Sequence, residues 1–216
     1  NKYFILIIIY IINMEEYGER VYTTKIIFLG ENDVGKSTIL ANIIYNKTVL
    51  PKGMYAFYKT FNKNDGSGEL LKINFWDTAH QENYNNIVPM FYKNAQAAIL
   101  VFDLGNRSSF EKLNEIMQKV REFAHPSIII FLVGNKTDLE IQGNRVITRE
   151  EAVKYAESIE AFYNEVSALQ KQGIDDLVDL IVSKIPKPSQ DNQVFRVERN
   201  QPLQMNFCTR VVCGAR

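Results

Sequence analysis

The sequence predicts an α/β domain built on a mostly parallel β-sheet. From Tyr22 onwards, short apolar runs alternate with longer segments of helical period, which is the pattern of parallel strands joined by crossover helices. A glycine-rich loop separates the first such run from the first helical segment. The length of 216 residues, with 46% hydrophobic and 23% charged residues, fits one globular domain.

The strands are predicted from runs of apolar residues. They are Lys25–Leu29, Lys72–Trp76, Ala97–Phe102 and Ser127–Val133. The last three are almost continuously apolar, as strands buried on both faces should be. A turn at Asp65–Gly68 separates Phe57–Phe61 from Leu70–Trp76 and predicts one antiparallel pair.

Helices are predicted where apolar residues recur with helical period. They are Lys36–Tyr45, Ser108–Phe123, Arg149–Ile159 and Ile174–Ile185. Ser108 and Thr148 occupy N-cap positions, and Thr148–Glu151 has the spacing of a capping box.

These elements predict a folded domain at residues 21–185. Pro186–Gln190 breaks the last helix, and the polar, aperiodic segment 186–216 is expected to be a flexible tail. Residues 1–20 are expected to be an extension outside the fold. Their apolar run Tyr3–Ile12 falls short of the about 20 residues that span a bilayer, and the small-residue cleavage pattern of a secretory signal does not follow it.

Charge and cysteine content exclude several classes of function. Lys plus Arg and Asp plus Glu are both 25, so the formal net charge is zero, and nucleic acid is not an expected partner. The two cysteines, Cys208 and Cys213, cannot form a disulfide framework or a four-thiolate zinc site, and they fit a reducing compartment.

The segment Gly30–Ser37 has the spacing G-x-x-x-x-G-K-S between a strand and a helix. Glycines let the backbone N–H groups surround a polyphosphate at the positive end of the helix, Lys36 reaches the β- and γ-phosphates, and the Ser37 hydroxyl binds Mg²⁺. The alternative, a glycine-rich turn with an incidental lysine, is disfavoured by the flanking strand and helix. The predicted phosphate-binding residues are Asp33, Val34, Gly35, Lys36, Ser37 and Thr38.

An acid follows a predicted strand further along the chain. Asp77 stands at the carboxyl end of that strand, the edge where parallel sheets bind ligands, so it is predicted to hold Mg²⁺ beside Ser37. Gln81, four residues later, is predicted to orient the water that attacks the γ-phosphate.

Two further segments at strand ends select the base. Asn135, Lys136 and Asp138 form an N-K-x-D pattern, and a carboxylate at Asp138 accepts hydrogen bonds from the N1–H and amine of guanine, whereas adenine has no donor at N1. A backbone N–H in the later segment is predicted to meet guanine O6. The predicted base-binding residues are Asn135, Lys136, Asp138, Ser167, Ala168 and Leu169.

With these four segments in order, the sequence resembles the Ras-like small GTPases. The stretches Trp76–Glu82 and Arg149–Ala156 resemble the Rab branch most, and the resemblance covers Val21–Ile185. It implies the P-loop small-GTPase fold, an α/β fold in which a mostly parallel six-stranded sheet and five helices pack with helices on both faces. It also implies GTP and GDP as ligands with Mg²⁺ as cofactor.

The resemblance further implies a molecular switch in vesicle trafficking that hydrolyses GTP slowly. An exchange factor, an activating protein and effectors are the implied partners. The implied location is the cytoplasm, with peripheral contact to the cytosolic face of an endomembrane.

The sequence departs from the family pattern in the switch segments. His80 replaces the glycine before the glutamine, and Thr48 and Tyr55 stand where the family has an aromatic residue and the threonine that closes over Mg²⁺. A guanine-nucleotide-binding scaffold with little hydrolysis therefore stays open as an alternative. The tail cysteines, Cys208 and Cys213, are either unmodified or prenylated by an unusual route, because the C-terminal Arg216 is outside the usual set of prenylation motifs.

Overall fold

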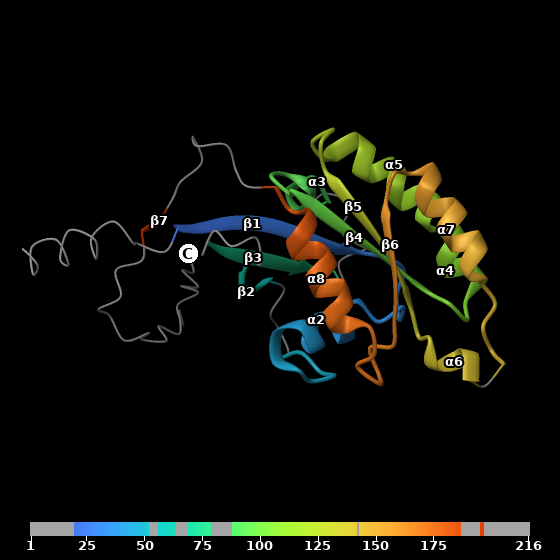
Figure 1. The fold of residues 1–216 in the computed structure, drawn as a ribbon. Coiled ribbons are helices and arrows are strands. Elements are labelled where there is room, and N and C mark those ends of the chain that lie inside the picture. The colour runs from blue at the N-terminus through green and yellow to red at the C-terminus, as the bar shows by residue number, and fades with distance from the viewer. Residues whose placement is uncertain are drawn as a thin grey trace, which may run out of the picture.

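The computed structural model describes residues 20–51, 56–63, 69–78, 88–141, 143–186 and 195–196. One mixed sheet runs through the centre of this part of the chain (Figure 1). Its six main strands are β1 (Arg20–Leu29), β2 (Ala56–Asn62), β3 (Leu70–Asp77), β4 (Ala97–Asp103), β5 (Ile129–Asn135) and β6 (Phe162–Val166).

The strand order is β2-β3-β1-β4-β5-β6. Only β2 is antiparallel to its neighbour in this row, and every other pairing is parallel, so the predicted fold class is confirmed. The two-residue strand β7 (Phe195–Arg196) pairs antiparallel with the first two residues of β1. Strand β1 therefore begins at Arg20, and two residues of the segment 186–216 lie beside it.

The strand register places five strand ends at one edge of the sheet. Phe28 in β1 is level with Asp77, the last residue of β3. Asp103, Asn135 and Val166 end β4, β5 and β6 level with one another. Because the central strands are parallel, the loops that follow these residues meet at the same edge.

Helices cover both faces of the sheet, with α2 and α8 on one face and α4, α5 and α7 on the other (Figure 1). The helices are α2 (Lys36–Tyr45), α3 (Val88–Tyr92), α4 (Arg107–Glu111), α5 (Leu113–Phe123), α6 (Asp138–Ile141), α7 (Arg149–Ser158) and α8 (Ile174–Lys184). Within the described residues, counting α4 with α5 and leaving out the four-residue α6 gives the five helices that the resemblance implied.

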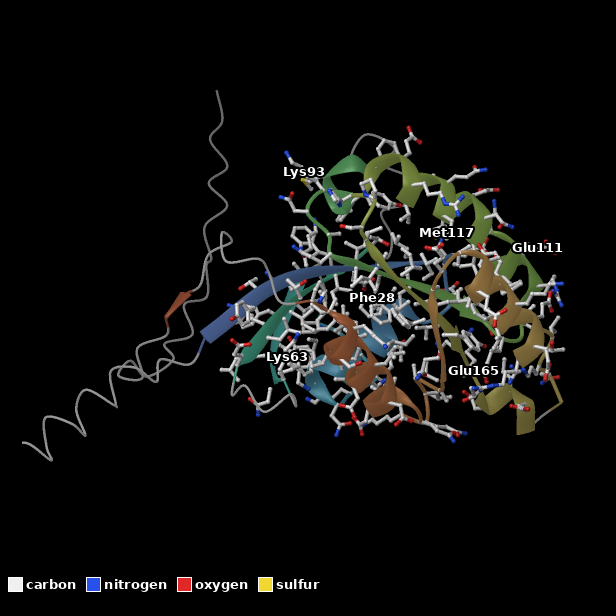
Figure 2. All side chains as sticks on the ribbon, turned by 45° about the horizontal axis from the view of Figure 1, so that its top comes forward. Phe28, Lys63, Lys93, Glu111, Met117 and Glu165 are labelled. Carbon is white, nitrogen blue, oxygen red and sulfur yellow. The ribbon has the colours of Figure 1, made fainter. Side chains whose placement is uncertain are left out.

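The two faces have separate apolar cores because alternate residues of each strand point to opposite sides. Ile26 and Phe28 pack with α2 and α8, whereas Ile27 and Leu29 pack with α3, α5 and α7. Figure 2 shows Phe28 in the interior and Glu111 at the periphery, as their burial requires. Two packed faces hold the sheet rigid, so the loops at its carboxyl edge start from fixed points.

One predicted N-cap is wrong. Helix α4 begins at Arg107, and its N-cap is Asn106, whose side chain accepts a hydrogen bond from the N–H of Ser109 at 3.4 Å. Ser108 lies inside the first turn, and the predicted single helix is divided at Lys112 into α4 and α5. Asn106 prevails because its N–H already closes a turn on the carbonyl of Asp103, which fixes where the helix starts.

The second predicted N-cap is confirmed. The Thr148 side chain accepts from the N–H of Glu151 at 3.2 Å. The Glu151 carboxylate does not complete a capping box; it pairs with Arg107 of α4. This contact joins the starts of two helices on the same face of the sheet.

Candidate functional site

The loop between β1 and α2 is closed by two glycines in a conformation that other residues rarely adopt. Gly30 has φ 149° and Gly35 has φ 97°. A Cβ on Gly30 would lie 2.2 Å from the carbonyl oxygen of Val101, and a Cβ on Gly35 would lie 2.2 Å from Nδ2 of Asn135. The loop therefore packs directly on the ends of β4 and β5, with the positive end of α2 behind it.

Lys36, the first residue of α2, has a buried ammonium group inside this loop. It donates hydrogen bonds to the carbonyl oxygens of Gly30 at 2.6 Å and Glu31 at 2.7 Å. A buried ammonium needs such acceptors. Phosphate oxygens bound in the loop would supply stronger, charged acceptors for the same donor.

Ser37 and Asp77, 40 residues apart in sequence, are in direct contact. The Ser37 hydroxyl donates to Oδ2 of Asp77 at 2.5 Å, and Asp77 is buried at the end of β3. The next residue, Thr78, fixes the exit of the strand by donating its hydroxyl to the Phe28 carbonyl at 2.7 Å. A hydroxyl and a carboxylate are hard oxygen ligands, so this pair fits Mg²⁺.

Asn135 joins the phosphate loop to the opposite side of the site. Its side chain is buried, and Nδ2 donates to the carbonyl of Val34 at 2.8 Å. Its Oδ1 accepts from the N–H of Ala168 at 3.0 Å. One side chain at the end of β5 thus holds two loops that are distant in sequence.

Asp138 and Lys136 follow Asn135 at the same edge. Asp138 begins α6 and accepts a hydrogen bond from the hydroxyl of Ser167, which is fully buried. Lys136 has a positive φ of 72° and forms an ion pair with Asp103, with Nζ 2.7 Å from Oδ2. The ends of β4, β5 and β6 are therefore tied to one another by side chains.

The loop between β1 and α2, the Ser37–Asp77 pair and the N-K-x-D segment all lie within a part of the chain that matches a known family. A sequence profile described as the Ras family matches residues 25–187. The chain belongs to the Ras family. As a Ras-family small GTPase it belongs to proteins that bind guanine nucleotides.

Curated relatives of this Ras-family chain carry Rab names. It is 36% identical over 166 residues to "Ras-related protein Rab-18" of Caenorhabditis elegans, covering 76% of this chain and 80% of the relative. It is 32% identical over 178 residues to "Ras-related protein RABF2a" of Arabidopsis thaliana, covering 81% and 86%. It is 33% identical over 190 residues to "Ras-related protein Rab-21" of Bos taurus, covering 85% and 82%.

Most of the predicted site residues of this Ras-family domain lie together at the carboxyl edge of the sheet. Those in the direct contacts above are Val34, Gly35, Lys36, Ser37, Asp77, Asn135, Lys136, Asp138, Ser167 and Ala168. Asp33 and Thr38 belong to the same loop and helix start. Leu169 follows Ser167 and Ala168 in the loop after β6, called the base loop below, and is 71% exposed. Their roles toward a nucleotide stay predictions.

Several predicted features lie outside the described residues. Gln81 and His80 are among them, as are Tyr55 and the turn at Asp65–Gly68. Thr48 is described and lies after the end of α2, partly exposed.

Two residues of the site were missed from the sequence. Asp103 stands at the end of a buried strand, the same signal that identified Asp77, and it pairs with Lys136. Asn42 lies in the middle of α2 and donates to the carbonyl of Ala168 at 2.8 Å. No sequence signal marks Asn42, because a polar residue inside a helix is ordinary.

A network of hydrogen bonds and ion pairs surrounds Glu165 of β6, next to the loop that contains Ser167. Arg145 donates to Oε1 and Oε2 of Glu165 at 2.7 and 3.1 Å, and the Tyr163 hydroxyl donates to Oε1 at 2.6 Å. Burial by itself raises the pKa of Glu165, but the hydrogen bonds from Arg145 and Tyr163 and the charge of Arg145 outweigh it and hold that pKa below its usual value. Glu165 is therefore ionised at neutral pH, two residues before Ser167.

Trp76 lies one residue before the predicted metal ligand at the end of β3. It is partly buried and packs edge-on against Phe91 of α3, with ring centroids 5.9 Å apart. The ammonium of Lys25 lies 4.5 Å from the indole centroid and donates to the carbonyls of Met90 and Lys93 at 3.1 and 3.0 Å. Trp76 is thus a packing residue that joins β1, β3 and the end of α3.

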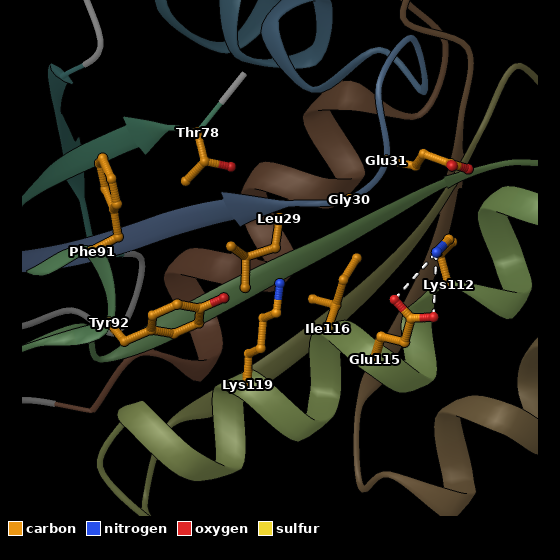
Figure 3. A pocket seen from close by; sticks show the side chains of 10 residues that line it. All are labelled: Leu29, Gly30, Glu31, Thr78, Phe91, Tyr92, Lys112, Glu115, Ile116 and Lys119. Carbon is orange, nitrogen blue, oxygen red and sulfur yellow. Dashed lines mark hydrogen bonds and ion pairs between the residues drawn. The ribbon is translucent and has the colours of Figure 1, made fainter. Parts of the chain in front are cut away.

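A cavity of about 270 Å³ opens beside the phosphate loop, on the face of the sheet that α3 and α5 cover (Figure 3). Gly30 and Thr78 form its wall near the loop, while Tyr92 and Lys119 extend toward each other from α3 and α5. Burial raises the pKa of Tyr92 to about 12, so its phenol is neutral. The cavity therefore lies on the face of the sheet opposite to α2, the helix that carries Ser37.

The helices of the described part of the chain were compared with the length and apolarity that a membrane-spanning helix needs. Within those residues, every helix is too short or too polar to cross a bilayer.

Proposed function

We propose that this Ras-family chain binds GTP and GDP with Mg²⁺, hydrolyses GTP slowly and acts as a switch in vesicle trafficking. The observation that carries the proposal is that Asn135 donates to the carbonyl of Val34 and accepts from the N–H of Ala168, because these two bonds hold the phosphate loop and the base loop at one edge of the sheet. The Rab names of the curated relatives support the trafficking role.

In this proposal, each predicted residue has one task. The N–H groups from Asp33 to Thr38 and the ammonium of Lys36 bind the phosphates, and Ser37 and Asp77 hold Mg²⁺. Asp138 accepts from the N1–H and amine of guanine, and a backbone N–H of Ser167–Leu169 donates to O6.

Catalysis would come from positioning and charge, since phosphoryl transfer to water needs little covalent help from the protein. Gln81 would orient the attacking water without taking its proton. Bound Mg²⁺ supplies positive charge at the β- and γ-phosphates.

We expect an activating protein to supply an arginine at the γ-phosphate. Three described arginines have partners elsewhere: Arg107 pairs with Glu151, and Arg145 and Arg149 pair with Glu165. An exchange factor and effectors complete the set of proposed partners, with the cytosolic face of an endomembrane as the proposed place of action.

Single-turnover GTP hydrolysis, with and without Mg²⁺, tests the proposal. Wild-type protein should hydrolyse GTP slowly and only with Mg²⁺, and Gln81→Leu should slow the reaction about a hundredfold, since it removes the group that positions the water. Binding of GTP must be equal in both proteins for the comparison to count.

The second candidate function is a guanine-nucleotide-binding scaffold. It is favoured by His80 in place of glycine and by Tyr55 in place of the expected threonine. A hydrolysis rate equal to that of buffer, unchanged in Gln81→Leu while GTP stays bound, would establish the scaffold and exclude the hydrolase.

A further inference from the structure

Asn42 forms a bond across the site that neither the phosphate pattern nor the base pattern contains. It is buried on α2, and its Nδ2 donates to the carbonyl of Thr38 in its own helix and to that of Ala168, 126 residues away, both at 2.8 Å. Its Oδ1 is buried, and within the described residues it has no hydrogen-bond partner. Burying an amide whose oxygen has no partner costs stability. The Nδ2 donor, which holds two carbonyls, is the half of this amide that the fold uses.

The bond to Ala168 fixes the orientation of a peptide group in the base loop. A trans peptide is planar, and its carbonyl and N–H point to opposite sides. With the Ala168 carbonyl held toward α2 by Asn42, the N–H of Leu169 in the same peptide must point away from α2. The preceding peptide is fixed as well, because the N–H of Ala168 donates to Asn135.

We propose that Asn42 is a positioning residue for the purine base. It orients the backbone N–H of Leu169 toward the 6-oxo group of guanine, because the N–H groups of Ser167 and Ala168 already donate to Gln172 and Asn135. It does so from the helix whose first residues, Lys36 and Ser37, serve the phosphates. This inference rests on the proposed nucleotide site. It assigns to α2 a second task, because the same helix sets the phosphate contacts at its start and the base contact one turn and a half later.

The variant Asn42→Leu removes the donor while keeping nearly the shape of the side chain. It also leaves the buried Ala168 carbonyl without this donor, so some loss of stability is expected. The test therefore compares two nucleotides that differ only at the 6-position, because a loss of stability alone would accelerate the release of both equally.

The test measures release of ribose-labelled fluorescent GDP from the full chain after a chase with unlabelled GDP. Asn42→Leu should release it about three- to tenfold faster, the loss expected for one hydrogen bond. The same measurement with the labelled 6-thio analogue, whose sulfur is a poor acceptor, gives the specific readout. Wild type should release the analogue faster than GDP, and in Asn42→Leu this ratio should fall toward one.

Lys171→Met is the matched control. Lys171 makes a second contact between this loop and the end of α2, donating to the carbonyl and side-chain oxygens of Asn46. Its loss should leave the ratio of the two release rates as in wild type. Unchanged release from Asn42→Leu, or an equal acceleration for both nucleotides, overturns the positioning role. Wild-type protein that retains no guanine nucleotide would instead refute the proposed function itself, and the inference with it.

Discussion

The two halves of the proposed nucleotide site are held together in different ways. On the base side, most contacts come from the neutral side chains of Asn135, Asn42 and Ser167, which bond to backbone groups and to Asp138. The one ion pair described there, between Lys136 and Asp103, joins two side chains of the protein to each other. On the phosphate side, a charged ammonium and a carboxylate bond to groups of the loop and to a hydroxyl.

The difference indicates which half a ligand must rearrange. Bonds such as Asn135 to Val34 remain possible with a base in place, so the base side is already assembled. The ammonium of Lys36 and the pair Ser37–Asp77 are bonded to partners that phosphate oxygens and Mg²⁺ would replace. We infer that the phosphate side supplies most of the affinity and the base side most of the selectivity.

Removing the charge on the phosphate side should have the largest effect. Lys36→Met should weaken GDP binding about a hundredfold or more, because each hydrogen bond to a charged group contributes about 1.5–3 kcal/mol. Titration calorimetry measures the affinity. Lys119→Met, on the opposite face beside the cavity, is the control and should bind as wild type does. A loss below threefold in Lys36→Met would place the affinity elsewhere.

Changing one acceptor on the base side should alter selectivity more than affinity for phosphate. Asp138→Asn keeps an oxygen for the Ser167 hydroxyl but presents a donor to the base, which suits the 2-oxo group of xanthine instead of the amine of guanine. We expect about thirtyfold weaker binding of GDP and tighter binding of xanthosine diphosphate. Competition between the two diphosphates measures the preference, and an unchanged preference would show that another group selects the base.

The contact between the halves is tested at Gly35. Gly35→Ala adds a Cβ 2.2 Å from Nδ2 of Asn135 at a φ of 97°, so it should displace the amide from Val34 and cost about 2–3 kcal/mol in the free energy of unfolding. Gly143→Ala is the matched control. It has a φ of 68° with nothing within 4 Å of a Cβ, so only the backbone strain of about 1 kcal/mol applies. Urea unfolding with GDP bound compares them, and equal losses would mean that the halves are not coupled at Gly35.

The smallest effect on the free energy of unfolding is expected at Glu165, next to the base loop. Glu165→Gln weakens the bonds with Arg145 and Tyr163 and should cost about 1 kcal/mol in the free energy of unfolding at pH 7. Because the pKa of Glu165 is held below its usual 4.5, the wild-type advantage is present above that pH and is lost as the pH falls through the lowered pKa.

Urea unfolding at pH 7, 5 and 3.5 checks the Glu165 prediction. The difference between wild type and Glu165→Gln should be similar at the first two values and smaller at the third. A difference that grows on acidification would have the wrong sign for a carboxylate held in its charged form.

The sequence was sufficient for the fold class and for Asp77 and Asn135 at strand ends, although Asp103 at the end of β4 was missed. Asp77 and Asn135 were found because a polar residue that closes an apolar run at the ligand edge is conspicuous. Helix α2 was predicted with its observed bounds because Gly35 and Asn46 mark its two ends.

Contacts between distant elements were not predictable. Asn42 contacts Ala168 only after folding brings α2 to the loop that follows β6. In the same way, Glu165 of β6 pairs with Arg145 only in the folded chain. Ser108 was predicted as an N-cap from its residue type, and the turn at Asp103 that makes Asn106 the cap is not visible in the residue types.

Trp76 is the only tryptophan of the chain. Its indole adjoins Asp77 in sequence and is flanked by the Lys25 cation and the Phe91 ring. Any change in how β3 meets α3 alters the electric field on this one chromophore. The protein therefore carries an intrinsic optical probe one residue from its proposed metal ligand, and we expect exchange of Mg²⁺ to change its ultraviolet emission.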